Sequence, residues 1–527
     1  MPSTNQPIPR NLKHLKYVSF LKSTFDEALE GKIGKVLLPW FKTLKNVQVL
    51  NAHYSIKTLI LANKYFSDLK SYSLKSAHAK ILQSLKTMRK TETLKISSLI
   101  KGTEVCQEGK NLRRIAMKKM VLDLSETNLG EMMKIAKLMP KSTRLHFNLS
   151  ALSSERHVNP YQAKLTERVD GIRLKQLSNS SLNSITQSTE YFMKSLTHLH
   201  LGKYSPGNAR IGVGKLNLET TSIFFSKLGE FSKLRSLQMD LNLVLFYTTC
   251  GTIEILKLLT LPVGLETLSL GFEEILTKGR SALVGEDFHQ IFDQIRKMKE
   301  LKALKFHFYM HHFCQKLWED FVRLFPQCLP KLEILSAEVR AFDLEVLIIP
   351  ENVFEWVHSH PMLRSVRLDM PLLNLFGLDC QKAFDFRIKS LESLYINIAH
   401  RKTEMRESFE GLVRFLADHE GLKRLTLRVF KSDDFPKTLV ILNKYLGAME
   451  NLKDLRLELV ISDGTELEKI SCLKPLMKKI KSFSLVIEKR NPNDGNQYYK
   501  LLKRLFADEI KNKRKGLEIG FNHMLVQ

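Results

Sequence analysis

The sequence has no long hydrophobic run and only six cysteines. No apolar stretch approaches the roughly 18 residues that a membrane-spanning helix needs, and stretches such as "LNLVLF" and "LEVLII" have the length of a buried strand. The cysteines lie far apart without a C-x-x-C pair, which indicates buried thiols in a reducing compartment. The N-terminal "MPSTNQPIPR" lacks the apolar core of a secretory signal. These absences predict a cytoplasmic protein with no membrane insertion. Association with the cytoskeleton and a mitochondrial or nuclear location stay open.

Acidic residues are also scarce at the N-terminal end, where the first are Asp26 and Glu27. Residues 1–150 contain 27 Lys and Arg against 10 Asp and Glu, a balance of +17, whereas residues 151–527 contain 55 against 45, a balance of +10. Just over a quarter of the chain therefore carries about three-fifths of the net charge of +27. Such asymmetry indicates an acidic partner, which is nucleic acid, an acidic protein face or anionic lipid. A lysine-rich surface that only contacts water is the alternative.

A short apolar frame, L-x-x-L-x-L, recurs along the chain. It is clearest in the second half, in "LTHLHL" from Leu196 and "LRSLQM" from Leu234, and it continues to "IKSFSL" from Ile480. In the first half the copies are looser, as in "LKNVQV" from Leu44. Counted from Leu12 there are 18 starts, about 30 residues apart on average. Self-similarity at such a period is typical of a solenoid.

Each repeat predicts one strand and one helix. The alternating apolar residues of the frame suit a short strand with one buried face. The segments between strands have helical spacing, and in residues 285–301 the apolar face consists of Phe288, Ile291, Phe292, Ile295 and Met298. The segment "RESFEGLVRFLADHEGL" repeats this pattern. One strand and one helix cannot bury their own apolar faces, so stacked copies must share a core.

These repeats resemble the leucine-rich-repeat family, in particular its ribonuclease-inhibitor-like branch with a helix in each repeat. The resemblance covers about residues 12–525. It implies an α/β solenoid, a horseshoe with a parallel sheet on the concave side and helices on the convex side. The chain departs from the family where an Asn usually follows the strand, because that place is mostly apolar, as at Leu459, Val429 and Ile398. A less regular curve is therefore expected.

The spacing of the frames predicts two parts. Early intervals are mostly 22–27 residues and later ones 28–38. We expect basic N-terminal repeats of short period over residues 1–190 and repeats of longer period over residues 191–527, continuous with the first part or separated by a slight break. The segment "NLKHLKYVSF", residues 11–20, fits the frame, which favours a first strand there over a targeting peptide.

Motifs for catalysis, cofactors or metals do not emerge from the sequence. "GNARIGVGK", residues 207–215, fails as a phosphate-binding loop, because Ala209 and Leu216 replace the required Gly and Ser or Thr. "HFYMHHFC", residues 307–314, holds potential zinc ligands, but alternation along a strand sends neighbours to opposite faces and places His307 on the concave face. We therefore expect no enzyme activity, no cofactor and no small-molecule substrate.

The solvent-facing places of the frame would line the concave face. In the ten strands from Leu196 to Ile480, these places hold 11 basic and 8 acidic residues. In the seven strands from Leu12 to Val169, they hold 11 basic and 3 acidic residues. Because stacked strands lie about 5 Å apart, the basic residues of the first half would form a long stripe. The candidate partner-binding residues are Lys13, Lys16, Lys45, Lys70, Lys75, Lys95, Lys118, Lys119, Arg144, Arg173 and Lys175.

A basic stripe on a solenoid favours a binding protein. The first hypothesis is a non-enzymatic protein–protein interaction scaffold that docks an acidic partner surface within a larger assembly, cytoskeletal or otherwise multi-subunit. The alternative is a component of a ribonucleoprotein that binds the backbone of RNA or DNA. Base stacking is not evident, because Tyr17 and Tyr72 are expected to point inward. A ubiquitin-ligase substrate receptor or a GTPase-activating protein is a remote alternative.

Overall fold

The structure of the protein is a computed structural model that describes segments distributed over the whole chain. These are residues 17–19, 42, 47–52, 64–65, 70–74, 92–108, 117–125, 127–150, 152–153, 168–177, 185–186, 192, 194–204, 218–242, 258–274, 285–313, 315–325, 329–344, 347–348, 359–369, 373–374, 390–399, 406–430, 435–461, 465–489, 495–507, 517–521 and 524–526. Contacts divide the chain into unit 1, Met1–Asp240 with Leu258–Pro262, and unit 2, Leu241–Lys257 with Val263–Gln527. The division expected at residue 190 concerns the repeat period and stays a prediction.

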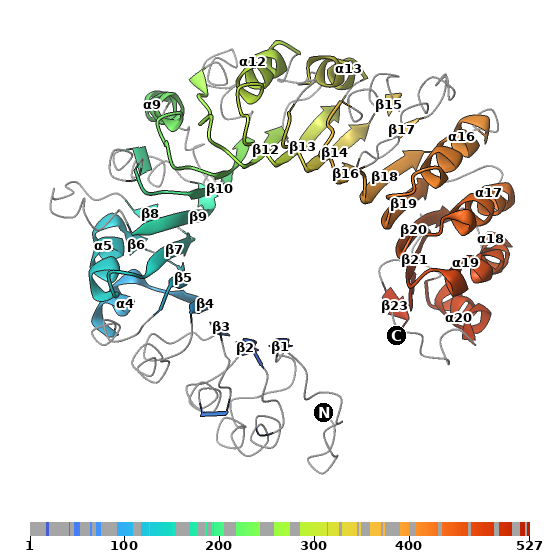
Figure 1. The fold of residues 1–527 in the computed structure, drawn as a ribbon, viewed down its shortest axis with the longest axis horizontal. Coiled ribbons are helices and arrows are strands. Elements are labelled where there is room, and N and C mark those ends of the chain that lie inside the picture. Colours follow the sequence, from blue (N-terminus) through green and yellow to red (C-terminus); the bar gives the residue numbers. More distant parts are fainter. Residues whose placement is uncertain are drawn as a thin grey trace, which may run out of the picture. The chain divides into compact units, whose positions relative to one another are not determined.

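Unit 1 contains a parallel sheet whose strands follow the order of the chain. They are β1 (Tyr17–Ser19), β2 (Val49–Ala52), β3 (Ser71–Leu74), β4 (Thr93–Ile100), β5 (Lys119–Leu124), β7 (Arg144–Leu149), β9 (Val169–Leu177), β10 (His198–Tyr204) and β11 (Ser236–Asn242). Each pairs in parallel with the next. The strands β6 (Thr127–Asn128) and β8 (Leu152–Ser153) form a separate pair. Helices lie on one side of the sheet (Figure 1) and are α4 (Gly102–Glu108), α5 (Leu129–Leu138) and α9 (Leu218–Leu228).

Unit 2 repeats this design. Its parallel strands are β12 (Thr267–Glu274), β13 (Ala303–Phe313), β14 (Ile334–Leu344), β16 (Ser365–Asp369), β18 (Ser393–Ala399), β19 (Arg424–Phe430), β20 (Asp454–Ile461), β21 (Ser482–Lys489) and β22 (Leu517–Phe521). The strand β23 (Met524–Val526) pairs antiparallel with β22, and β15 (Leu347–Ile348) pairs with β17 (Leu373–Asn374). One side of the sheet carries the helices (Figure 1), which are α12 (Gly285–Ile295), α13 (Gln315–Leu324), α16 (Arg406–Ala417), α17 (Phe435–Ala448), α18 (Thr465–Lys469), η6 (Ile470–Leu473), α19 (Lys474–Lys479) and α20 (Gly495–Leu505).

The apolar frame forms the core of both units. The central frame residues Leu425, Leu455 and Phe483 are partners on neighbouring strands, and all three are buried. In unit 1, Ile172 and Leu199 pair in the same way and are buried. The α/β architecture is therefore confirmed as parallel sheets with helices, an arrangement compatible with a repeat solenoid.

The expected helical faces also lie in the core. Helix α12 buries Ile291, Phe292 and Ile295 against the sheet. The ring of Phe292 lies 5.4 Å from that of Phe321 in α13 and 5.7 Å from that of Phe306 in β13. Helix α16 forms within the second segment that has this pattern. Aromatic packing between repeats thus joins the helices to the strands.

The pairing of β1, β2 and β3 corrects the frame at the N-terminal end. Leu50 pairs with Tyr72, which is the buried central residue of its frame, and Val18 pairs with Leu50. Val18 and Leu50 therefore occupy the central place of their frames. Frames counted from Leu12 and Leu44 put that place three residues earlier in the sequence. The sequence allowed both registers because apolar residues recur at several places in these loose copies. Strand β1 itself lies within residues 11–20, as expected.

Two glycines provide a matched test of the packing. A Cβ at Gly202 in β10 would overlap the backbone carbonyl oxygens of Lys175 and Leu174 in β9, whereas a Cβ at Gly447 in α17 would meet no neighbouring atom within 4 Å. Gly202→Ala should lower the free energy of unfolding by about 1–3 kcal/mol through overpacking. Gly447→Ala should raise it by about 0.5–1 kcal/mol through helix propensity. Urea unfolding followed by circular dichroism measures both, and a Gly202→Ala variant as stable as the wild type would contradict this packing.

Candidate functional site

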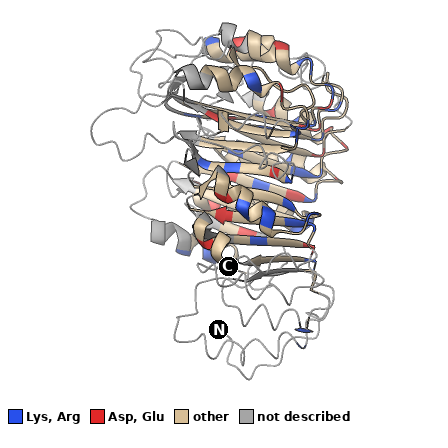
Figure 2. Ribbon diagram, turned by 90° about the vertical axis from the view of Figure 1, so that its left-hand side faces the viewer, with Lys and Arg blue, Asp and Glu red and all other residues tan. Residues whose placement is uncertain are grey.

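Each sheet has a second face, which we call the helix-free face, opposite the helices. Along β5 the side chains of Met120, Leu122 and Leu124 are buried, while the intervening ones, such as Lys119 and Asp123, are partly exposed. The pleat of a strand produces this alternation. In Figure 2 bands of both charge colours mark the described strands and helices. The helix-free faces are therefore the candidate binding surfaces.

Seven of the eleven predicted basic residues belong to the described part of unit 1. Lys13, Lys16, Lys45 and Lys75 lie outside the described residues. The other seven are exposed or half-buried, on the strands or just before them: Lys70, Lys95, Lys118, Lys119, Arg144, Arg173 and Lys175. Lys119 and Arg144 are direct partners on neighbouring strands, so two positive charges lie side by side.

Among the residues of unit 1 that the structure describes, the acids leave most of that positive charge without an ion pair. Of the seven basic residues, only Lys118 forms an ion pair with another described residue, with its Nζ 3.0 Å from Oε1 of Glu92. Asp123 accepts a hydrogen bond from the amide of Asn148 on β7, and Asp170 on β9 accepts one from the hydroxyl of Thr197. Neutral donors, and not the cations, satisfy these two carboxylates.

Three histidines lie among the basic residues, namely His146 on β7 and His198 and His200 on β10. Gly171 on β9 has no side chain, so the rings of His146 and His198 approach to 6.2 Å across that strand. Burial, followed by the charge of Lys119, lowers the pKa of His146 to about 4. Burial, followed by the charge of Arg173, lowers the pKa of His200 to about 4. Both imidazoles are neutral at pH 7, partly because their surroundings are positive.

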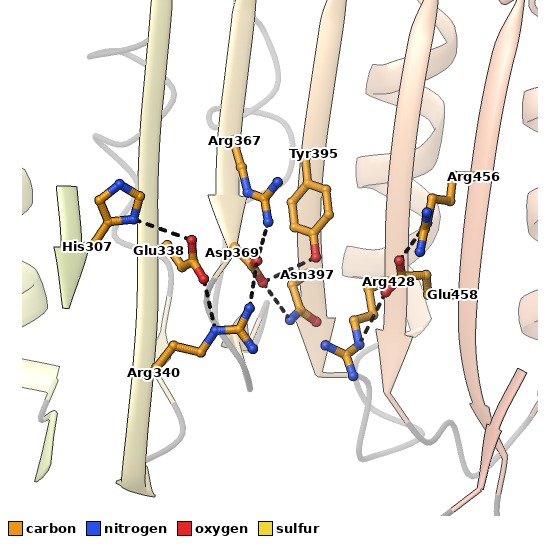
Figure 3. Close-up of polar contacts among 10 residues, drawn as sticks. All are labelled: His307, Glu338, Arg340, Arg367, Asp369, Tyr395, Asn397, Arg428, Arg456 and Glu458. Atoms are coloured by element: carbon orange, nitrogen blue, oxygen red, sulfur yellow. Dashed lines mark hydrogen bonds and ion pairs between the residues drawn. The ribbon is translucent and has the colours of Figure 1, made fainter. Parts of the chain in front are cut away.

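Unit 2 has a different arrangement, in which arginines contact buried carboxylates (Figure 3). Nη2 of Arg367 lies 2.7 Å from Oδ2 of Asp369, and Nη2 of Arg340 lies 3.8 Å from the same oxygen. The hydroxyl of Tyr395 donates to Oδ1 of Asp369 at 3.2 Å, and its ring lies under the guanidinium of Arg367 at 4.4 Å. Asp369 therefore holds charged and aromatic groups from three neighbouring strands in one cluster.

A second cluster of this kind surrounds Glu458 on β20. Nε of Arg456 lies 2.7 Å from Oε1 of Glu458, and Nε of Arg428 on β19 lies 3.6 Å from Oε2 (Figure 3). Glu458 is buried. A buried carboxylate needs such partners, because its removal from water costs several kcal/mol when it stays unpaired.

His307 lies on the helix-free face, as the alternation of β13 predicts. Its Nδ1 lies 3.4 Å from Oε2 of Glu338 on β14, and Nε of Arg340 lies 2.9 Å from the other oxygen. His307 thus contacts the Glu338–Arg340 ion pair. Within the described part of the chain, no group of three or more His, Cys, Asp or Glu side chains is placed to hold a metal ion.

The two faces therefore differ in how their charge is balanced. The difference lies within the strands, because a lysine–glutamate pair just before a strand occurs in both units: Lys118 with Glu92 in unit 1, and Lys302 with Glu266 and Lys423 with Glu392 in unit 2. The count of basic and acidic residues from the sequence shows that the strands of unit 2 are nearly neutral. It does not show which of the charges form ion pairs. The spacing Arg-x-acid in "RLD", residues 367–369, and "RLE", residues 456–458, could have indicated it, because it places both side chains on one face of a strand.

No family model matches the chain, and no curated protein matches it either. Among the helices that the structure describes, none is long and apolar enough to span a membrane. The assignment of a function therefore rests on the geometry and charge of the two faces.

Protonation of Glu338 should destabilise the fold at low pH. His307, acting against burial and assisted by Arg340, holds the pKa of Glu338 at about 2. Because this folded-state pKa lies below the usual value of about 4.3, the carboxylate stabilises the fold fully above about pH 5, and the stabilisation is lost as pH falls through about 2. Glu338→Gln should remove about 1–2 kcal/mol of this pH dependence of the free energy of unfolding, after allowance for solvent screening.

Urea unfolding at a series of pH values between about 7 and 2 measures this dependence. Glu420→Gln is the matched control, because Glu420 is exposed and its carboxylate forms no ion pair with another described residue. A Glu338→Gln curve parallel to that of the wild type would contradict the stabilising role of the His307–Glu338–Arg340 contacts.

Proposed function

We propose that the chain is a leucine-rich-repeat solenoid of the ribonuclease-inhibitor-like branch, with the helix-free face as the concave side of a horseshoe. Support comes from the repeated frame, whose apolar residues are buried, and from the parallel strands with helices on one side of each sheet. Stacked repeats of this kind present extended binding surfaces. A surface of this type suits a macromolecular partner better than a small ligand.

On this fold the protein acts as a non-enzymatic scaffold that docks an acidic surface of a partner protein within a larger assembly. The observation that carries the proposal is the positive charge that the described acids of unit 1 do not compensate. Lys95, Arg144 and Arg173 are exposed and form no ion pair with another described residue, while the nearby carboxylates bond to neutral donors. A surface with charge of one sign attracts and orients a partner of the opposite sign.

RNA or DNA is the second candidate, because phosphates also neutralise a row of basic side chains. Stacking of bases on aromatic rings contributes strongly to many such interfaces. Tyr72, the aromatic residue of β3, is completely buried and is not available for stacking. Phosphate contacts would then have to supply the affinity, so an acidic protein surface is favoured.

Reversal of three charges on the helix-free face of unit 1 tests the scaffold proposal. We expect the triple variant Lys95→Glu, Arg173→Glu and Lys175→Glu to lose the proteins that co-purify with the tagged wild type at low salt after nuclease treatment. The amount recovered should fall about tenfold or more, because like charges brought together at an interface cost several kcal/mol. Quantitative mass spectrometry of the purified material measures the loss.

The matched control makes the same change of net charge at exposed positions outside the helix-free face, with Lys101→Glu, Lys134→Glu and Lys141→Glu. This variant should keep its partners. Equal losses in both triple variants would contradict a specific role for the helix-free face. Partners that disappear from the wild type on nuclease treatment, with RNA or DNA in the untreated sample, would favour the second candidate.

A further inference from the structure

Arg367 on β16 and Arg456 on β20 occupy equivalent places in their repeats. The register runs from Arg367 through Tyr395 on β18 and Thr426 on β19 to Arg456, three strand steps in all. At about 4.8 Å for each step, the two positions lie about 14 Å apart. Each arginine contacts a buried carboxylate two residues further along its own strand.

Both arginines reach solvent although their carboxylates do not. The side chains of Arg367 and Arg456 are 45% and 46% exposed, whereas that of Asp369 is 6% exposed. Arg367 donates to Asp369 through Nη2, and Arg456 donates to Glu458 through Nε. Neither guanidinium forms a further hydrogen bond with another described residue. The remaining N–H groups are thus held in a fixed orientation that suits a second carboxylate.

Asp369 and Glu458 are each shared by two arginines, Arg340 and Arg367 in one cluster and Arg428 and Arg456 in the other. A carboxylate ligand adds one negative charge beside each cluster. A phosphate dianion would leave excess negative charge next to a buried carboxylate, so the arrangement favours a carboxylate ligand.

We infer that the helix-free face of unit 2 binds an extended acidic segment of a partner protein, in which two carboxylates four residues apart contact Arg367 and Arg456. In an extended chain, residues i and i+4 face the same side and lie about 13–14 Å apart, which matches the separation of the two arginines. Residues i and i+2 lie only about 7 Å apart and reach one cluster at most. Tyr395 and Thr426 line the path between the arginines. This site goes beyond the proposed function, because it lies wholly in unit 2.

Synthetic peptides test the required spacing. The probe is a short peptide of Ser and Thr with blocked ends and two Glu residues at i and i+4, titrated into the full chain at low salt by fluorescence anisotropy. It should bind about tenfold more tightly than peptides with Glu at i and i+2 or with a single Glu, because each charge-assisted contact contributes a factor of about ten or more. Equal affinities would overturn the inference. Tighter binding of a peptide with phosphoserine at i and i+4 would also overturn it.

Substitution of one arginine tests which residues provide the contacts. Arg456→Gln should lower the affinity for the two-Glu peptide about tenfold, to that of the single-Glu peptide. Binding of the single-Glu peptide at Arg367 should persist, which also shows that the variant is folded. Arg323→Gln, on the exposed surface of α13, is the matched control and should change neither affinity. An unchanged affinity of Arg456→Gln for the two-Glu peptide would overturn the inference.

The charge-reversed variant of unit 1, with substitutions at Lys95, Arg173 and Lys175, separates this site from the proposed function. It should bind the two-Glu peptide like the wild type, even though it loses the co-purifying partners. A peptide affinity that falls in this variant as much as in Arg456→Gln would overturn the placement of the site in unit 2.

Discussion

Alternation of buried and exposed side chains along each parallel strand is the constraint on which both surfaces depend. Frame residues such as Leu425 and Leu455 must face the helices, because there they lose contact with water. The residues between them must then face the opposite side of the sheet. Since successive strands pair with equivalent places in register, each place of the frame becomes a row of side chains about 5 Å apart. Each candidate binding surface is built from such rows.

The two units use these rows in opposite ways. In unit 2, Asp369 and Glu458 are buried, and arginines from neighbouring strands compensate their charge. In unit 1, Lys119 and Arg144 lie opposite one another, which destabilises a sheet. The nearby acids bond to neutral groups and do not relieve this repulsion. An acidic partner of the proposed kind would relieve this repulsion on binding, so the proposal gives these unpaired charges a role.

Much of the fold could be predicted from the sequence, because burial follows a local pattern. The strands with clear Leu frames and the helix of residues 285–295 formed where their apolar spacing indicated. The register of Val18 and Leu50 could not be predicted, since it depends on pairing with Tyr72 of the next strand. The contact of Arg340 with Asp369 joins residues of different repeats. Such a contact depends on both strand register and burial. A count of charges in the sequence therefore cannot predict it.

The position of the charged row in unit 2 follows from strands that continue beyond the six-residue frame. Val339, Val429 and Leu459 lie two places after the last frame residue, and all three are buried. The alternation of buried and exposed residues therefore continues beyond the frame. Glu338 and Glu458, which directly precede Val339 and Leu459, lie within a paired strand and not at its end. Less water reaches a side chain there, so its ion pairs are stronger than at an exposed strand end. The same apolar residues that depart from the leucine-rich-repeat pattern thus keep the arginine–carboxylate clusters within paired strands, where the proposed ligand would meet them.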